Sequence, residues 1–208
     1  TGDIHNCYDC VYNHGSWTAW GVMQILDMQD GLRQYSGPGH WNDPDMMQIG
    51  NGMPLNEQRA HFTMWAMINA PLMAGNDLRN IPAETLNVLT NKEVIALNQD
   101  SLGIQAFRYA VNDSVETWLK PLQNDEWALV YLNRSKSEKA ISVNWKNFKL
   151  VDDLSGRLFD TTTKDVFIVR DLWIKNDIGD TRKTLNTTLA GKDVLCLKIR
   201  QKAIKNRK

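Results

Sequence analysis

Hydrophobic and polar positions follow two different patterns along the 208-residue chain, and the change falls near Gly103. Before Gly103 the apolar residues recur mostly at intervals of three and four, which is typical of amphipathic helices. After Gly103, short runs alternate apolar and polar residues and are separated by turn-prone residues, as in an antiparallel sandwich. We therefore expect two domains, an α/β region over residues 1–103 and an all-β region over residues 104–208.

The first region predicts three helical segments. Residues 16–26 have helical apolar spacing, and Ser16 suits the position of an N-cap. Pro54 opens a second helix that runs to about Asn69. Residues 82–97 hold one or two more helices, because Asn91 could cap a second one within this segment.

Two short segments between these helices, residues 34–47 and 70–75, are apolar or aromatic and are bounded by Gly and Pro. Both fit parallel strands of a buried sheet. The order helix, strand, helix, strand, helix is the α/β pattern. A (β/α)₈ barrel takes about 250 residues, or roughly thirty per β/α unit. This region supplies about three such units, so we expect residues upstream of Thr1 to complete the barrel.

The composition excludes two classes of partner. Lys+Arg and Asp+Glu are both 24, so the formal net charge is +0, and 42% of residues are hydrophobic. Binding to nucleic acid or to an anionic membrane needs a basic face, which this balance does not favour. No run reaches the eighteen or so apolar residues that span a bilayer.

The segment 41–46 (WNDPDM) is the first candidate for chemistry. It lies at the C-terminal end of a predicted strand, where barrel enzymes place their active sites. Asp45 can accept hydrogen bonds from sugar hydroxyls, while Trp41 and Met46 offer apolar contact to ring carbons. A plain turn, in which Asp43 and Asp45 bond the local backbone, is the structural alternative. The D-x-D string also resembles the metal site of some glycosyltransferases, but no further ligands stand out nearby.

The start of the chain holds a second cluster, His5, Cys7, Cys10 and His14, spaced as H-x-C-x₂-C-x₃-H. These residues could ligate zinc in principle, but the spacing is tight for four ligands from one segment. A disulfide, a free pair of thiols or a polar loop is favoured, and no metal site is assigned. Asp3, taken alone, fits a helix cap or a surface carboxylate.

Together these strings resemble glycoside hydrolase family 27, the α-galactosidases and α-N-acetylgalactosaminidases. The matching stretches are TGDI (1–4), GPGHWNDPDMMQIGNG (37–52), HFTMWAMINAPLMAGNDLR (61–79), NKEVIALNQDSLGIQ (91–105), ALVYLNRS (128–135) and RDLW (170–173). The resemblance implies the last three β/α units of a TIM barrel followed by an antiparallel β-sandwich. The segment 5–14 departs from the family's pattern directly beside Asp3.

The resemblance also implies a retaining mechanism with two aspartates. It maps Asp3 onto the catalytic acid/base at the end of the sixth strand, and it maps Asp45 and Met46 onto substrate-binding positions after the seventh; we add Trp41 as a substrate contact. An acid/base of this kind needs a raised pKa, so Asp3 is expected to be partly desolvated or near another carboxylate. No position here matches the family's nucleophile, and both carboxyls are required about 5 Å apart, so this stretch alone is expected to be inactive.

The expected function is hydrolysis of terminal α-galactosides on oligosaccharides or glycoconjugates, without cofactor or metal. The alternatives are an α-N-acetylgalactosaminidase or related family member, and a non-catalytic carbohydrate-binding protein with a degenerate barrel. The resemblance further implies a secreted, periplasmic or lysosomal location. No nucleic-acid or membrane partner is expected.

Overall fold

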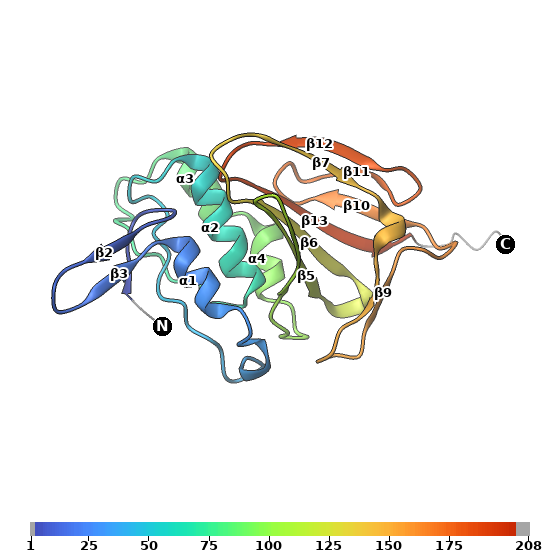
Figure 1. The fold of residues 1–208 in the computed structure, drawn as a ribbon, viewed down its shortest axis with the longest axis horizontal. Helices are drawn as coiled ribbons and strands as arrows, with labels where there is room; N and C mark the ends of the chain where they lie inside the picture. The colour runs from blue at the N-terminus through green and yellow to red at the C-terminus, as the bar shows by residue number, and fades with distance from the viewer. Residues whose placement is uncertain (1–2, 203–208) are drawn as a thin grey trace.

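The computed structural model describes residues 3–202, so Thr1 and Gly2 of the TGDI string lie outside the described residues. The first region contains β1 (Asp3–Ile4), β2 (Val11–Asn13), β3 (Thr18–Trp20), α1 (Val22–Gln29), the 3₁₀ helix η1 (Arg33–Tyr35), α2 (Leu55–Met67), α3 (Ala83–Leu89) and α4 (Lys92–Asn98). Strands β1 and β3 pair in parallel, and β2 pairs antiparallel with β3. The β2–β3 hairpin projects from the left edge of the molecule in Figure 1.

Two of the three helical predictions are confirmed. Helix α2 follows Pro54, and residues 82–97 divide into α3 and α4. The side chain of Asn91 accepts hydrogen bonds from the backbone N–H of Glu93 and of Val94, so Asn91 caps α4 as expected. The cap at Ser16 is wrong: residues 18–20 form strand β3, because their backbone pairs with strands on both sides, and α1 begins only after Gly21.

The predicted strands at 34–47 and 70–75 are correct in direction but wrong in length. They meet only in a single parallel bridge between Met47 and Ala74. Pro38 and Pro44 have no N–H to donate to a ladder. In addition, Asp45 has φ of 77°, outside the extended region. Because of these interruptions most of residues 34–47 form a loop, which pairs with residues 70–75 only at the Met47–Ala74 bridge.

The second region, as far as residue 202, contains ten strands and two 3₁₀ helices. They are β4 (Phe107–Asn112), β5 (Val115–Pro121), η2 (Gln123–Asp125), β6 (Trp127–Asn133), β7 (Lys139–Val143), η3 (Trp145–Asn147), β8 (Lys149–Val151), β9 (Leu158–Asp160), β10 (Phe167–Asp171), β11 (Asn176–Asp180), β12 (Leu185–Leu189) and β13 (Val194–Gln201). Six form one antiparallel sheet in the order β11-β10-β13-β6-β5-β4, and the pairs β12-β7 and β8-β9 form two smaller sheets.

The central strands of the large sheet are buried on both faces, and alternate residues along each strand point to opposite sides. In β6, Ala128 and Val130 pack into the cluster shared with the helices, while Trp127 and Leu129 pack into the cluster beneath β7, β8, β9 and β12. Figure 1 shows the helices on one side of the large sheet and β7 and β12 on the other. The free thiol Cys196 is buried on the helix side.

The chain is therefore a partial α/β region followed by an antiparallel β-sandwich, which is the fold class expected from the sequence. One hydrophobic cluster joins the two regions, since it contains Trp65 of α2 together with Trp118 of β5. Ion pairs also cross between them, including Glu93–Arg170 and Glu57–Lys192, both at 2.7 Å. Among the described residues, no helix is both long and apolar enough to cross a membrane.

Candidate functional site

The structure brings the loop of Asp45 against the strand that carries Asp3. The backbone N–H of Ile4 donates to Oδ2 of Asp45 at 2.9 Å, across 41 positions of sequence. Asp3 is the preceding residue in β1, and it is paired in register with Ala19 of β3. The loop of Asp45 is thus bonded to the strand that carries Asp3, and the sequence had predicted these two site residues separately.

Asp45 is fixed by four hydrogen bonds. Besides the bond from Ile4, its Oδ1 accepts the N–H of Met46 at 2.7 Å, and its own N–H donates to Oδ1 of Asp43 at 2.9 Å. Its carbonyl accepts the indole N–H of the buried Trp65 at 2.9 Å. The predicted alternative of a turn with local backbone bonds is therefore present, and the same carboxylate also makes the long-range bond to β1.

Met46 lies at the surface beside this turn, with 40% of its area exposed. Its position depends on Gly75, because a Cβ built on Gly75 would lie 2.6 Å from Sδ of Met46 and 2.8 Å from the carbonyl oxygen of Met47. A side chain at position 75 would displace the thioether. Met46 is therefore packed against Gly75 while part of its side chain stays exposed.

Trp41 lies apart from this pair of carboxylates. Its ring is 45% exposed and packs over Gly103, whose built Cβ would lie 3.2 Å from Cη2. It lines a cavity of about 400 Å³ together with Pro38, Asn98 and Asp100 among others, and the lining of this cavity does not include Asp3, Asp45 or Met46. Trp41 and Met46, which the sequence predicted as parts of one substrate site, therefore do not line the same cavity.

The described residues leave Asp3 exposed, so they do not provide the desolvation that sequence reasoning expected of an acid/base. Asp45 bonds the backbone N–H of Ile4, the residue next to Asp3. That a carboxylate lies close to the Asp3 carboxyl group itself stays a prediction. The roles of Asp3, Asp45, Met46 and Trp41 remain predictions.

The segment 5–14 next to Asp3 forms a disulfide, which was one of the favoured alternatives. Cys7 and Cys10 are bonded, with their Cα atoms 6.1 Å apart. His14 is separated from them and instead stacks on Trp17, with ring centroids 3.9 Å apart. His5 stacks on Tyr12 at 4.9 Å. The four-ligand metal arrangement considered from the spacing is therefore not formed.

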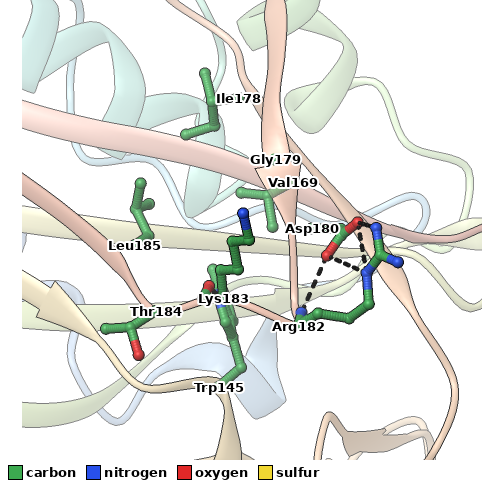
Figure 2. Close-up of a pocket in the computed structure, with 9 residues that line it drawn as sticks. All are labelled: Trp145, Val169, Ile178, Gly179, Asp180, Arg182, Lys183, Thr184 and Leu185. Atoms are coloured by element: carbon green, nitrogen blue, oxygen red, sulfur yellow. Dashed lines mark hydrogen bonds and ion pairs between the residues drawn. The ribbon is translucent and has the colours of Figure 1, made fainter.

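A second cavity, of about 380 Å³, lies in the sandwich and was missed by sequence reasoning. It is lined by Trp145, Val169, Ile178, Gly179, Asp180, Arg182, Lys183, Thr184 and Leu185, which Figure 2 shows around the β11–β12 connection. Asp180 is engaged by Arg182, whose hydrogen bond lowers the pKa of that carboxyl to about 2. The indole N–H of Trp145 donates to the carbonyl of Lys183 at 3.0 Å. No sequence pattern marked this set, because its residues come from separate short strands.

Comparison with known proteins assigns both regions. Residues 2–100 match the family model described as "Alpha galactosidase A", and residues 112–199 match the model described as "Alpha galactosidase C-terminal beta sandwich domain". The two models follow each other in the order of the two regions of the fold. Both regions are therefore homologous to glycoside hydrolases of the α-galactosidase type.

Individual relatives agree with the two models. α-Galactosidase A of Cellvibrio japonicus is 45% identical over 201 residues, which cover 96% of this chain and 49% of that protein. Human α-N-acetylgalactosaminidase is 44% identical over 132 residues, which cover 61% of this chain and 31% of that protein. The crystal structure of α-galactosidase I from Mortierella vinacea superimposes with a TM-score of 0.81 at 29% identity, covering 96% of this chain and 51% of that one.

The chain belongs to the α-galactosidase family, glycoside hydrolase family 27. It spans about half the length of the Cellvibrio relative and of the Mortierella structure that it matches.

Proposed function

We propose that this chain supplies the C-terminal half of a retaining exo-glycosidase that hydrolyses terminal α-galactosides. Asp3 is the acid/base, and Asp45, Met46 and Trp41 contact the substrate. The observation that carries the proposal is the bond between the Ile4 N–H and the Asp45 carboxylate, because it joins the two predicted site segments across 41 positions of sequence.

In the first step, protonated Asp3 donates its proton to the glycosidic oxygen as the bond to the anomeric carbon breaks. In the second step, the Asp3 carboxylate takes a proton from the water that attacks the glycosyl intermediate. The nucleophile that forms this intermediate has no matching residue in this chain. It is proposed to come from the part of the barrel that its relatives place before the matched half.

The test uses a chimera in which this chain replaces the matching 201 residues of the Cellvibrio enzyme. The chimera is expected to release galactose from terminal α-galactosides. Asp3→Asn is expected to lower turnover of an alkyl galactoside by about a hundredfold to ten-thousandfold, since loss of general acid/base catalysis costs that much. The first step with a nitrophenyl galactoside, whose leaving group needs little protonation, is expected to slow far less.

Asp9→Asn is the matched control, because Asp9 is an exposed carboxylate of the same segment that bonds the Gln24 amide. It is expected to leave turnover unchanged. An active chimera whose turnover of the alkyl galactoside survives Asp3→Asn would disprove the acid/base role. A chimera that binds galactose but hydrolyses neither substrate would favour the carbohydrate-binding alternative.

A second candidate function is hydrolysis of α-N-acetylgalactosaminides. It is favoured by the 44% identity to the human α-N-acetylgalactosaminidase over 132 residues. The two activities are separated by assaying the chimera with both nitrophenyl glycosides. The choice of sugar also depends on the half of the chimera that comes from the Cellvibrio enzyme. The control is therefore a second chimera, in which that half comes from the human relative instead.

A further inference from the structure

The connection between β1 and β2 gathers three potential metal ligands at one point. The ligand atoms of His5, Cys7 and Cys10 all lie within 4.8 Å of one another. One imidazole nitrogen and two sulfurs at this separation can surround a single ion, and this donor set is the one that zinc prefers. In the structure the two sulfurs are joined in a disulfide, so only His5 offers a free donor atom.

Nδ1 of His5 is buried and has no hydrogen-bond partner among the described residues. A buried imidazole nitrogen without a partner is costly unless something binds it. The ring itself is held in place, because it stacks on Tyr12 at 4.9 Å with an interplanar angle of 21°. The imidazole of His5 is thus held with one ring nitrogen within 4.8 Å of both sulfurs.

The backbone around the two cysteines is anchored independently of the disulfide. The carbonyl oxygens of Cys7 and Cys10 accept the N–H groups of Val22 at 2.9 Å and of Gly21 at 2.7 Å. The N–H of Cys10 donates to Oε1 of Gln24 at 3.1 Å. The disulfide links residues only three positions apart, and closing so short a loop constrains the chain little. Reduction is therefore expected to leave both sulfurs near their present positions.

We propose that the reduced form of this segment binds one Zn²⁺ through Nδ1 of His5 and the two sulfurs of Cys7 and Cys10, with water in the fourth position. A dithiol reductant supplies the two electrons: its thiolate attacks one sulfur, its second thiol releases the resulting mixed disulfide, and the reductant leaves as its own cyclic disulfide. Zn²⁺ then displaces one proton from each cysteine thiol. The disulfide and the zinc site are two alternative states of the same residues. This site does not depend on the proposed hydrolase activity.

The test is a Co²⁺ and Zn²⁺ titration of the 208-residue chain, first oxidised and then reduced with dithiothreitol and desalted under nitrogen. The reduced chain is expected to bind one Co²⁺ with a near-ultraviolet thiolate charge-transfer band and the visible bands of a tetrahedral ion, and Zn²⁺ is expected to abolish both. The oxidised chain is expected to show neither. His5→Ala and Cys7→Ser are expected to weaken binding by more than about a hundredfold, and Tyr12→Ala by about tenfold through loss of ring orientation.

Cys196→Ala and His14→Asn are the matched controls, since they remove a cysteine and a histidine outside the cluster; both are expected to bind as the native chain does. A reduced chain that stays folded by circular dichroism but gives no charge-transfer band overturns the proposal. So does a band that survives Cys7→Ser or is lost in Cys196→Ala. If the reduced chain unfolds without metal, recovery of its spectrum on adding Zn²⁺ supports the site, and failure to recover contradicts it.

Discussion

The carboxylate of Asp45 accepts the backbone N–H of Ile4 at 2.9 Å and that of Met46 at 2.7 Å, one on each oxygen. An asparagine at this position can accept only one of these bonds and turns an N–H₂ donor toward the other N–H. Its backbone still tolerates the φ of 77°. Asp45→Asn is therefore expected to destabilise the chain by about 1.5–3 kcal/mol, the usual contribution of a hydrogen bond to a charged group. Urea unfolding measures this free energy.

Amide hydrogen exchange separates the local effect from a general loss of stability. In Asp45→Asn the Ile4 amide is expected to exchange faster than the change in global stability alone explains. Asp43→Asn is the control, because its Oδ1 accepts only the N–H of Asp45 and an asparagine can do the same. Unchanged protection of Ile4 in Asp45→Asn would show that this bond does not hold β1 to the loop.

Met46 and Trp41 face different spaces, so their truncation is expected to have unequal effects on the proposed activity. In the Cellvibrio chimera, Met46→Ala is expected to lower kcat/KM by about tenfold, which corresponds to the loss of one apolar contact. Trp41→Ala is expected to change it less, because its ring lies over Gly103 and away from Asp45. Steady-state kinetics with an α-galactoside decide the order, and a larger loss in Trp41→Ala would assign the substrate to the cavity beside residues 98–103.

The sequence predicted helix α2, whose own apolar spacing is strong, and missed elements that depend on a partner. Strand β11 (NDIGD) has almost no apolar residues, and it is a strand because β10 pairs with it. The strand predicted over residues 34–47 shows the reverse case. Its composition is apolar, but its prolines and the positive φ of Asp45 prevent extended pairing.

The site was predicted only as far as its local strings. Asp45 and Met46 could be nominated from one short motif and its family resemblance. The bond from Ile4 to Asp45 could not, because it joins positions 41 residues apart through packing of the whole α/β region. The orientation of the Trp41 ring could not be predicted either, because it depends on a contact with Gly103, which comes after α4 in the chain.

His61 in α2 is fully buried, and neither ring nitrogen has a hydrogen-bond partner among the described residues. Burial lowers the pKa of this imidazole from 6.5 to about 3. The folded chain then excludes a proton that the unfolded chain binds below pH 6.5. Stability is fully present above that pH and is expected to fall by about 1.4 kcal/mol per pH unit between pH 6 and 3 from this group alone.

Urea unfolding of the native chain and of His61→Leu at pH 7.5, 5.5 and 4.5 measures the contribution. The difference between the two chains is expected to shift in favour of the variant as the pH falls, because leucine takes up no proton. His40→Asn, an exposed histidine, is the control and is expected to follow the native chain. A pH-independent difference between native and His61→Leu would refute the assignment.

Lys120 of β5 is fully buried at the end of α2, where its Nζ donates to the carbonyl oxygen of Ala66 at 3.2 Å and to Oδ1 of Asn69. Burial lowers the pKa of this ammonium group to about 7, and the negative charge of Asp100 partly opposes that shift. Between pH 7 and 10.5 the unfolded chain holds a proton that the folded chain has released. This group therefore raises the free energy of unfolding as the pH rises through that range, by at most about 1.4 kcal/mol per unit.

Lys120→Met is expected to remove this slope of the unfolding free energy between pH 7 and 9.5, as measured by urea unfolding. Lys198→Met, which removes a partly exposed lysine paired with Glu126, is expected to keep the slope. If the native chain and Lys120→Met show the same slope, the ammonium group keeps its proton in the folded chain, held by the carbonyl oxygens at the end of α2.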